Sequence, residues 1–484
     1  MNEILEGACL EVMKGFREES VDLVVTDPPY GYGFMGKDWD RAVPSVDVWK
    51  ECLRVLKSGA FAFVMSSPRQ DVLSQMIVRL GLAGFDTAFS SIYWAYASGF
   101  PKAMNISKAI DRREGLEREV TGTRISAYGD SELSETKDGR NLWAKPSTKI
   151  VELKQKPVSE EAKSLDGSYG GFQPKPAIEV ILVCMKPLSE KTFVDQALKN
   201  GKGVTWLDDA RIPFQSTEDF NGALEAHREP DAFFKQDGRS TVVPSGGSPS
   251  TEKGRFPANL LVSDDVLNDG KKTTSSGGNG EASWKTQIGK DGIYGKYENR
   301  LGEGLGGYRD SGSFSRYFDL DKWFEKTVLN LPESVRKTFP FLICPKASKA
   351  ERNKGCDALP EQNVRKEDGS WGSLEVFSNT YTEQSGNPSN RGSTPKHRNI
   401  HPTVKPLKLM SYLVTLGSRP NDVVLDPFCG SGTTCLASEI LNRQWLGIDI
   451  NPEYCLIARK RLATIPAKLD VFLANAGKPL ERGC

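Results

Sequence analysis

Short apolar runs alternate with a helical stretch along the first part of the chain. EIL at the N-terminus, VDLVVT at 21–26 and AFAFVM at 60–65 have the length and composition of buried strands, whereas VDVWKECLRVLK at 46–57 is helical in pattern. TAFSSIYWAY at 87–96 and AIEVILVCM at 177–185 add two strand-like runs, separated by a polar segment that looks like an insertion. This alternation predicts an α/β fold with a mostly parallel sheet.

A strand, a glycine turn, a helix and a second strand follow one another in VVLDPFCGSGTTCLASEILNRQWLGIDINPEY at 423–454. This order predicts a βαβ unit with a ligand site at the turn. Gly430 and Gly432 carry no side chain where the backbone must approach a ligand. The hydroxyls of Thr433 and Thr434 are placed to satisfy free N–H groups at the start of the helix. A carboxylate group of a ligand would bind well there.

Asp449 closes the second strand about 20 residues after the turn, where its carboxylate can accept hydrogen bonds from both hydroxyls of a ribose. A nucleoside cofactor is therefore indicated. The turn reads FCGSGTT and lacks the lysine that a nucleoside triphosphate needs, which disfavours both NAD and ATP. S-adenosylmethionine fits better. A glycine turn that serves only tight packing is the alternative.

The sequence DPPY at 27–30 follows VDLVVT, at the carboxyl end of a strand, where parallel-sheet enzymes keep their sites. The Asp27 carboxylate and the Pro28 carbonyl can both accept hydrogen bonds from an amino group whose lone pair is delocalised into a ring. Tyr30 offers a face on which a base can stack, worth roughly 1 to 3 kcal/mol. Taken alone, these four residues favour a structural turn capped by the aspartate, and only their combination with the glycine turn favours a catalytic loop.

The chain resembles the β-class amino-methyltransferases of DNA, in which a catalytic motif, a target-recognition region and a cofactor motif follow in this order. HPTVKP at 401–406 is similar to the family motif just upstream of the cofactor loop, which implies that Lys405 lies near the methionine carboxylate. SGFPKAMNISKAID, GRFPANLLV and CPKASKAERN look like a subgroup common in bacterial and phage genomes. The resemblance implies a Rossmann-like class I methyltransferase sheet, permuted so that the catalytic motif comes first.

The resemblance also implies a division of the chain around a large inserted region. The expected parts are the catalytic half of the core at 1–119, an insertion at 120–176, a core strand and helix at 177–200, the target-recognition region at 201–390, and the cofactor-binding half of the core at 391–484. Residues 240–315 are rich in Gly, Ser and Asn and too poor in apolar residues for a core, so flexible loops are expected there.

The predicted site has a catalytic part and a cofactor-binding part. The expected catalytic residues are Asp27, Pro28, Pro29 and Tyr30. The expected cofactor-binding residues are Thr403, Lys405, Asp426, Phe428, Gly430, Gly432, Thr433, Thr434 and Asp449. The chain departs from the family at Gly7-Ala8, because similar enzymes often have Gly-Asp there and the aspartate can bond the cofactor's adenine. Weaker cofactor affinity is therefore expected.

The resemblance implies a site-specific enzyme that methylates N6 of a flipped adenine in double-stranded DNA. Transfer to cytosine N4 is the first alternative, although similar cytosine enzymes more often have Ser in place of Asp27. A catalytically silent DNA-binding protein of the same fold is the second. Related protein-glutamine and RNA-guanine enzymes usually place the cofactor motif first, which argues against both. Whether the chain forms a homodimer, or has a restriction enzyme as partner in a restriction-modification system, stays open.

Composition and charge change this picture only locally. The 64 Lys and Arg residues nearly balance 63 Asp and Glu residues, so overall charge indicates no partner. Two basic runs, Arg391–Lys408 and Lys346–Lys354, are candidates for contact with DNA phosphates, and a solvated surface is the alternative for each. The nine cysteines and three histidines show no metal-ligand spacing, so no metal is expected. The N-terminus shows no signal or membrane segment, and a cytoplasmic protein is expected.

Overall fold

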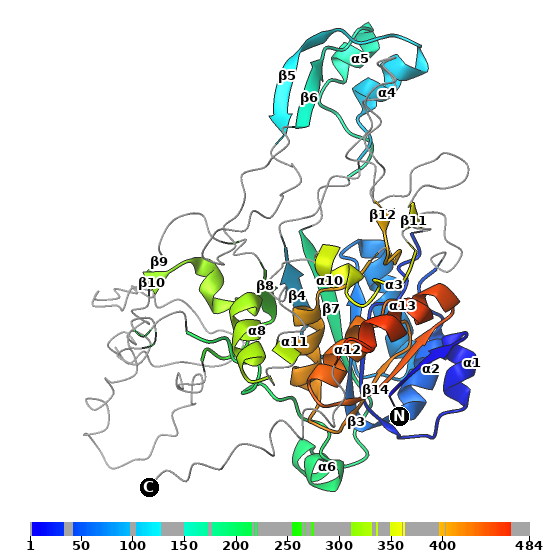
Figure 1. The fold of residues 1–484 in the computed structure, drawn as a ribbon, viewed down its shortest axis with the longest axis vertical. Helices are drawn as coiled ribbons and strands as arrows, with labels where there is room; N and C mark the ends of the chain where they lie inside the picture. The colour runs from blue at the N-terminus through cyan, green and yellow to red at the C-terminus, as the bar shows by residue number, and fades with distance from the viewer. Residues whose placement is uncertain are drawn as a thin grey trace, which may run out of the picture. The chain divides into compact units, whose positions relative to one another are not determined.

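An eight-stranded sheet forms the core of the larger of two compact units in the computed structural model of the chain (Figure 1). The larger unit comprises Met1–Ala97 with Ile178–Cys484, and the smaller unit comprises Ser98–Ala177. The residues that the structure describes are 2–32, 42–96, 103–126, 150–172, 177–214, 217, 220, 254–263, 267, 273–274, 311–331, 335–336, 349–360, 362–363, 396–401 and 403–465.

The strands of the large sheet come from both ends of the chain. In sheet order they are β1 (Glu3–Glu6), β14 (Gln444–Asp449), β13 (Val423–Asp426), β2 (Val21–Thr26), β3 (Leu56–Ser66), β7 (Ile178–Met185), β4 (Ile92–Ala95) and β8 (Leu260–Val262). Neighbours run parallel except at β7, which is antiparallel to β3 and to β4. The predicted α/β fold with a mostly parallel sheet is confirmed, and each run predicted as a strand contributes one.

Helices cover both faces of this sheet (Figure 1). Side chains alternate along each strand, so Leu23 and Val25 pack on one face of the sheet and Val24 packs on the other. The face of Val24 is covered by α1 (Cys9–Lys14), α2 (Val46–Val55) and α3 (Gln70–Ala83). The opposite face is covered by α8 (Leu320–Leu329), α11 (Leu407–Gly417), α12 (Thr433–Ile440) and α13 (Pro452–Leu462).

Helix α2 ends two residues before the end of the predicted helical run at 46–57. Leu56 and Lys57 instead begin β3. Leu56 is fully buried opposite Val21 of β2, and Lys57 forms an ion pair with Asp22. Tertiary pairing with β2 therefore overrides the helical periodicity at these two positions.

The order of the strands reverses between β2 and β13. The chain leaves β13 through α12 toward β14 on one side, and it leaves β2 through α2 toward β3 on the other. Open α/β sheets bind their ligands outside the carboxyl ends of the strands at such a reversal. Both predicted motifs, DPPY and FCGSGTT, begin at this edge of the sheet.

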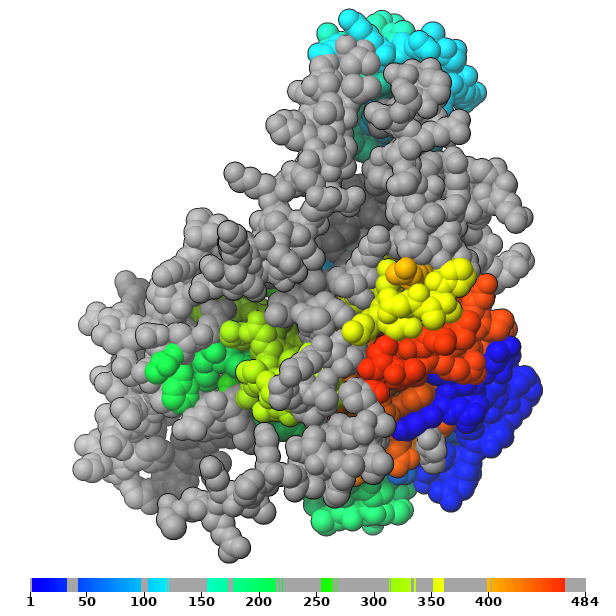
Figure 2. All heavy atoms as spheres, viewed as in Figure 1, coloured from blue at the N-terminus to red at the C-terminus, as the bar shows by residue number. Residues whose placement is uncertain are grey.

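The N-terminal and C-terminal segments of the larger unit are packed together. Edge strand β1 pairs in parallel with β14, and Arg459 Nη2 of α13 donates a hydrogen bond of 2.8 Å to Ile4 O. Figure 2 shows the N-terminal segment in blue directly against the C-terminal segment in orange and red. One edge of the sheet is therefore formed by strands from distant parts of the sequence, β1 and β14.

The predicted target-recognition region at 201–390 also contributes to the main core. Strand β8 pairs with β4, and Trp323 of α8 packs edge-on against Tyr412 of α11 with ring centroids 4.9 Å apart. Trp206 N donates to Leu416 O at 2.9 Å. Most of the stretch at 240–315, predicted as flexible loops, lies outside the described residues.

The smaller unit is organised around Asp111, which is 1% exposed. Asp111 accepts hydrogen bonds from Arg118 Nε at 2.6 Å and from Ser159 N at 3.1 Å. The elements of the unit are α4 (Ile106–Arg113), β5 (Val120–Ser126), β6 (Ile150–Gln155) and α5 (Glu160–Ser164). Asp111 thus ties α4 to the segment that starts α5, within the compact unit Ser98–Ala177.

Candidate functional site

Asp426, the last residue of β13, joins the loops that follow β2 and β13. Its Oδ1 accepts hydrogen bonds from Thr26 Oγ1 at 2.7 Å and from Phe428 N at 3.1 Å. Its Oδ2 accepts one from Thr434 Oγ1 at 2.6 Å. Burial raises the pKa of Asp426 to about 6, and these hydrogen bonds only partly oppose that effect. The two predicted motif loops are therefore held side by side by one buried carboxyl group.

Asp27, the first residue of DPPY, is bound by two other side chains. Tyr30 Oη donates to Asp27 Oδ1 at 2.7 Å, and Lys405 Nζ forms an ion pair with Asp27 Oδ2. A carboxylate has about four acceptor positions, so Asp27 keeps capacity for further N–H donors. Burial, followed by the Asp27 charge, raises the pKa of Tyr30 well above its usual value, so the phenol stays protonated as a donor.

Lys405 of HPTVKP lies between two carboxylates. Its Nζ contacts Asp27, and Glu179 Oε2 is 3.7 Å from the same nitrogen. Burial disfavours the charged ammonium, yet Asp27 and Glu179 outweigh this effect and raise the pKa of Lys405. Lys405 is therefore a cation at neutral pH. The contact with a methionine carboxylate that the resemblance implies for this lysine stays a prediction.

Glu179 is the member of this cluster that sequence reasoning missed. It is the second residue of β7, which enters the sheet at the edge where β3 ends. Tyr96 Oη, near the end of β4, donates to Glu179 Oε1 at 3.5 Å. A signal was present in the sequence, because IEVILVCM is an apolar strand with a single charged residue, and a charge in such a strand needs a partner.

The glycine turn is shaped by neighbouring side chains of the protein. Gly430 has φ +51°, and a Cβ added there would lie 2.4 Å from His401 Nε2. Gly432 has φ +76°, and its added Cβ would lie 2.8 Å from Ala458 Cβ. The sequence explained both glycines by close approach of a ligand. The structure gives each of them a packing reason that is independent of any ligand.

Asp449, the last residue of β14, braces the glycine turn. Its Oδ2 accepts from Gly430 N at 2.9 Å, and its Oδ1 accepts from Asn451 N at 2.8 Å. Burial raises the pKa of Asp449, while the two backbone donors act in the opposite direction. The side chain is partly exposed, and each oxygen keeps acceptor capacity. The carboxylate is thus oriented at the carboxyl edge of the sheet, beside the turn.

The threonines at the start of α12 do not satisfy free N–H groups as predicted. Thr434 donates to Asp426, and the Thr433 hydroxyl accepts a hydrogen bond of 3.0 Å from Arg461 Nη1. The residue before the helix is Gly432, in a left-handed conformation. The two hydroxyls therefore attach α12 to β13 and to α13.

The other predicted site residues lie around this arrangement. Pro28 is buried, Pro29 is partly exposed, and Thr403 is exposed with its N–H donated to His401 Nδ1 at 3.4 Å. The Phe428 ring lies 6.3 Å from the Trp49 ring, so it packs toward α2. Ala8, where the family often has aspartate, is exposed just before α1.

The two predicted basic runs are partly used inside the protein. Lys408 is 1% exposed and forms an ion pair with Asp321, so the prediction that it contacts DNA is wrong. Arg352 Nη2 donates to His401 O at 2.7 Å. Arg391 and Lys346 lie outside the described residues.

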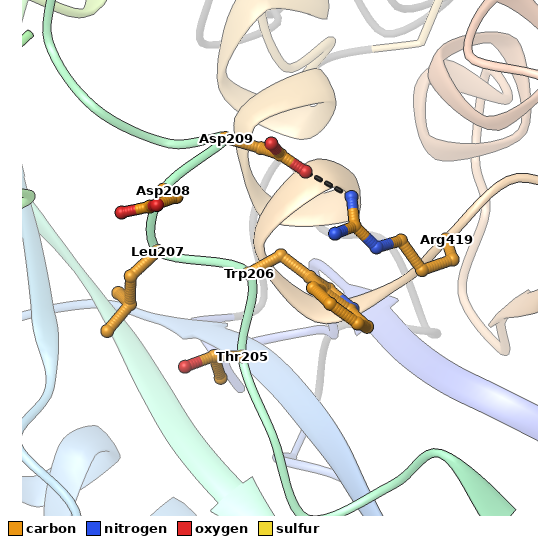
Figure 3. A pocket seen from close by; sticks show the side chains of 6 residues that line it. All are labelled: Thr205, Trp206, Leu207, Asp208, Asp209 and Arg419. Carbon is orange, nitrogen blue, oxygen red and sulfur yellow. Dashed lines mark hydrogen bonds and ion pairs between the residues drawn. The ribbon is translucent and has the colours of Figure 1, made fainter. Parts of the chain in front are cut away.

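A cavity of about 240 Å³ lies at the end of the sheet opposite the two motif loops (Figure 3). Its lining residues are Thr205, Trp206, Leu207, Asp208, Asp209 and Arg419. The Arg419 guanidinium lies 3.4 Å from the centre of the Trp206 ring and is paired with Asp209. Arg419 precedes β13, so this cavity is at the amino ends of the parallel strands, away from both motif loops.

In the described ranges, no group of three His, Cys, Asp or Glu side chains is arranged to hold a metal ion. No helix in that part of the chain has the length and apolar character needed to span a bilayer.

Residues 298–460 match the model of a family described as DNA methylase, the N6_N4_Mtase family. This span contains HPTVKP and the glycine turn, while DPPY lies before it. Type II methyltransferase M.HpaI of Haemophilus parainfluenzae is 48% identical over 67 residues, which are 14% of this chain and 21% of that protein. Type II methyltransferase M2.DpnII of Streptococcus pneumoniae is 47% identical over 62 residues, 13% of this chain and 23% of that protein.

The chain thus covers about a fifth of the length of these two relatives. The solved structure of PvuII DNA methyltransferase, which is cytosine-N4-specific, aligns with a TM-score of 0.37 and 13% identity over 95% of this chain and 85% of that one. So distant a likeness adds nothing to the assignment, which rests on the sequence matches. The match at 298–460 places this part of the chain in the N6/N4 family of DNA amino-methyltransferases.

Proposed function

We propose that this protein transfers the methyl group of S-adenosylmethionine to N6 of adenine in double-stranded DNA. The observation that carries the proposal is the Thr26–Asp426 hydrogen bond of 2.7 Å, which joins the DPPY loop to the glycine turn where the strand order reverses. An acceptor for an amino group and a candidate nucleoside site then share one edge of the sheet. The family of residues 298–460 supports the same class of reaction.

Asp27 would act on the target amino group. The lone pair of an exocyclic amino nitrogen is delocalised into the base ring, so acceptors must draw on its N–H bonds before it can attack. The Asp27 carboxylate and the Pro28 carbonyl are such acceptors. Direct transfer to the nitrogen needs no covalent intermediate on the enzyme, and positioning together with electrostatics would supply most of the rate. Tyr30 would stack on the flipped base.

The residues present fit S-adenosylmethionine. The two backbone donors that fix Asp449, at 2.9 and 2.8 Å, orient its carboxylate and leave acceptor capacity for the ribose hydroxyls. The N-terminus of α12, after Gly430 and Gly432, would hold the carboxylate of the methionine part. When bound, S-adenosylmethionine supplies an electrophilic methyl group.

Adenine is proposed over cytosine because position 27 is aspartate, whereas similar cytosine-N4 enzymes more often have serine there. Both amino groups would meet the same acceptors, so cytosine N4 is the second candidate. The product on DNA distinguishes the two directly.

The test compares DNA from cells that express the wild type, Asp27→Asn or Asp47→Asn. Asp27→Asn keeps the size of the side chain and removes its charge, and Asp47→Asn makes the same change at a residue of α2 that is 69% exposed. Long-read mapping and nucleoside mass spectrometry should find N6-methyladenine in one sequence motif for the wild type and the control, and none for Asp27→Asn. Detection of N4-methylcytosine would instead make cytosine the target base of the enzyme. DNA without any methylated base would overturn the proposal.

Cofactor binding is tested separately by calorimetric titration with S-adenosylmethionine. Asp449→Ala should weaken binding about tenfold or more, since about 1.4 kcal/mol or more is expected from two ribose hydrogen bonds to a charged group. Asp27→Asn should change the affinity by less than about twofold, because its proposed role is in the transfer step. Equal affinity in the wild type and Asp449→Ala would exclude the proposed pocket.

A further inference from the structure

One buried guanidinium group binds three oxygen atoms at the glycine turn. Arg461 of α13 is 1% exposed, and its Nη1 donates to Ser431 O at 2.6 Å, to Ser431 Oγ at 3.0 Å and to Thr433 Oγ1 at 3.0 Å. Its Nε and Nη2 are buried and have no hydrogen-bond partner among the described residues. Burial lowers the pKa of Arg461, although the charge of Glu351 acts in the opposite direction.

The N–H groups at the start of α12 remain available to another acceptor. Within the described residues, no acceptor binds the backbone N–H of Ser431, Thr433 or Thr434, and no side chain caps the helix. The first N–H groups of a helix point out along its axis, where they bind anions. Because Arg461 binds the oxygens of the turn, these donors can face a ligand without competing acceptors beside them.

A second buried arginine, at the other end of α12, shows what distinguishes Arg461. Arg443 is 6% exposed and donates to Leu441 O and to Ser418 O, each at 2.7 Å. Its charge is favourable there, because the C-terminal end of a helix carries partial negative charge. Arg461 lies at the N-terminal end, where the partial charge is positive and opposes its own. An anion bound at that end would relieve this repulsion.

Other cations act at the same place. Burial, followed by the charges of Arg352, Lys405 and Arg461, lowers the pKa of His401 to about 3, so these three cations all act where His401 meets the glycine turn. Lys405 is itself paired with Asp27. A carboxylate at the start of α12 would be attracted both by these cations and by the helix terminus, in partly buried surroundings where charges interact more strongly than in water.

We propose that Arg461 is a positioning residue for the carboxylate of the methionine part of S-adenosylmethionine, which directs the oxygens of the glycine turn away from that carboxylate and adds positive charge behind the free N–H groups. This inference rests on the proposed function, because it concerns the cofactor of that reaction. Arg461 acts through the turn, since it is buried. If Arg461 only held α13 to α12, its loss would weaken every ligand of the pocket equally, with or without a carboxylate.

The experiment measures the binding of two ligands to the full-length chain by calorimetric titration. S-adenosylmethionine carries the carboxylate, and decarboxylated S-adenosylmethionine lacks only that group. The wild type should bind the first roughly 10- to 100-fold more tightly, because charge-assisted hydrogen bonds are lost with the second. Arg461→Gln should reduce this preference about fivefold or more by weakening the binding of S-adenosylmethionine. Its affinity for the decarboxylated ligand should stay within about twofold of the wild type.

Arg443→Gln is the matched control, because it makes the same change at a buried arginine that binds oxygens at the other end of α12. Its preference for the carboxylate should stay within about twofold of the wild type, since its charge is remote from the N–H groups of the turn. Arg461→Lys keeps the charge but has fewer donors, so its preference should lie between those of the wild type and Arg461→Gln.

The outcomes separate the role of Arg461 from the function itself. Equal weakening of both ligands in Arg461→Gln, or an unchanged preference, overturns the role of Arg461 and leaves the proposed function standing. A wild type that binds both ligands equally also overturns the role. A wild type that binds neither ligand defeats the proposed cofactor and with it the proposed function. If Arg461→Gln does not fold, Arg461→Lys decides alone, and a preference equal to that of the wild type then overturns the role.

Discussion

The His401 imidazole occupies the space that a side chain at position 430 would need, since a Cβ on Gly430 would lie 2.4 Å from His401 Nε2. The HPTVKP segment and the glycine turn are therefore fitted to each other directly. The ring of His401 also packs edge-on against Tyr454 of α13, with centroids 4.6 Å apart, so the imidazole has little room to move aside.

Gly430→Ala is expected to lower the free energy of unfolding by about 2 to 4 kcal/mol, because a clash with His401 adds to the strain of a positive φ. Gly201→Ala is the matched control, with φ +72° and nothing within 4 Å of its added Cβ. Gly201→Ala should lower the free energy of unfolding by about 1 kcal/mol, which is the cost of a positive φ alone. Chemical denaturation measures both. Equal losses would mean that His401 yields to the new methyl group.

Lys408→Met should reduce stability and leave DNA binding unchanged. The side chain is 1% exposed and its ammonium is paired with Asp321. Removing one partner of a largely buried pair should cost about 1 to 3 kcal/mol in unfolding free energy. DNA affinity measured over a range of salt concentrations should keep its slope. A slope smaller by about one would instead assign Lys408 to a phosphate contact.

His401 should make the protein less stable at acidic pH. Burial, followed by the nearby Arg352 and Lys405 charges, lowers the pKa of His401 from 6.5 to about 3. Below pH 6.5 the unfolded chain takes up a proton that the folded chain does not, so the stability present above that pH is lost as pH falls toward 3. Urea denaturation from pH 7 to about 5 should show the wild type losing up to about 1.4 kcal/mol per pH unit more than His401→Gln. Parallel pH curves for the two proteins would contradict this.

Tyr30 has two separable features, a ring and a hydroxyl that donates to Asp27 at 2.7 Å. If the ring stacks on a flipped base, Tyr30→Ala should raise the KM for DNA roughly 5- to 150-fold, which corresponds to about 1 to 3 kcal/mol. Tyr30→Phe keeps the ring, so its KM should stay near that of the wild type. Methylation assays over a range of DNA concentrations separate the two. An unchanged KM in Tyr30→Ala would remove the stacking role.

Features that are contiguous in the sequence could be predicted from it. The strand before Asp27 and the βαβ unit around the glycine turn follow from apolar patterning, glycine placement and the acidic end of the second strand. No pattern of residues predicted that β2 lies beside β13. Only the family resemblance, through its order of motifs, implied this pairing. The Thr26–Asp426 hydrogen bond is the physical form of that adjacency.

Contacts between distant segments could not be predicted. The fit of His401 against Gly430 depends on how two separate loops pack, so no pattern within either loop predicts it. Lys408 was counted with the basic run by composition, although its position inside the first turn of a buried helix turns it inward to Asp321. Glu179 was passed over within an apolar strand, since only the fold brings Lys405 to it.

The pairing of β2 with β13 also bears on how the chain is made. Thr26 and Asp426 are 400 residues apart, so at about 5 to 20 residues per second the partner of β2 leaves the ribosome roughly 20 to 80 s after β2 itself. Until then one edge of β2, a fully buried strand in the finished sheet, has unpaired N–H and C=O groups. Nascent chains of this protein should therefore depend on chaperone protection, and fragments truncated before residue 423 should aggregate.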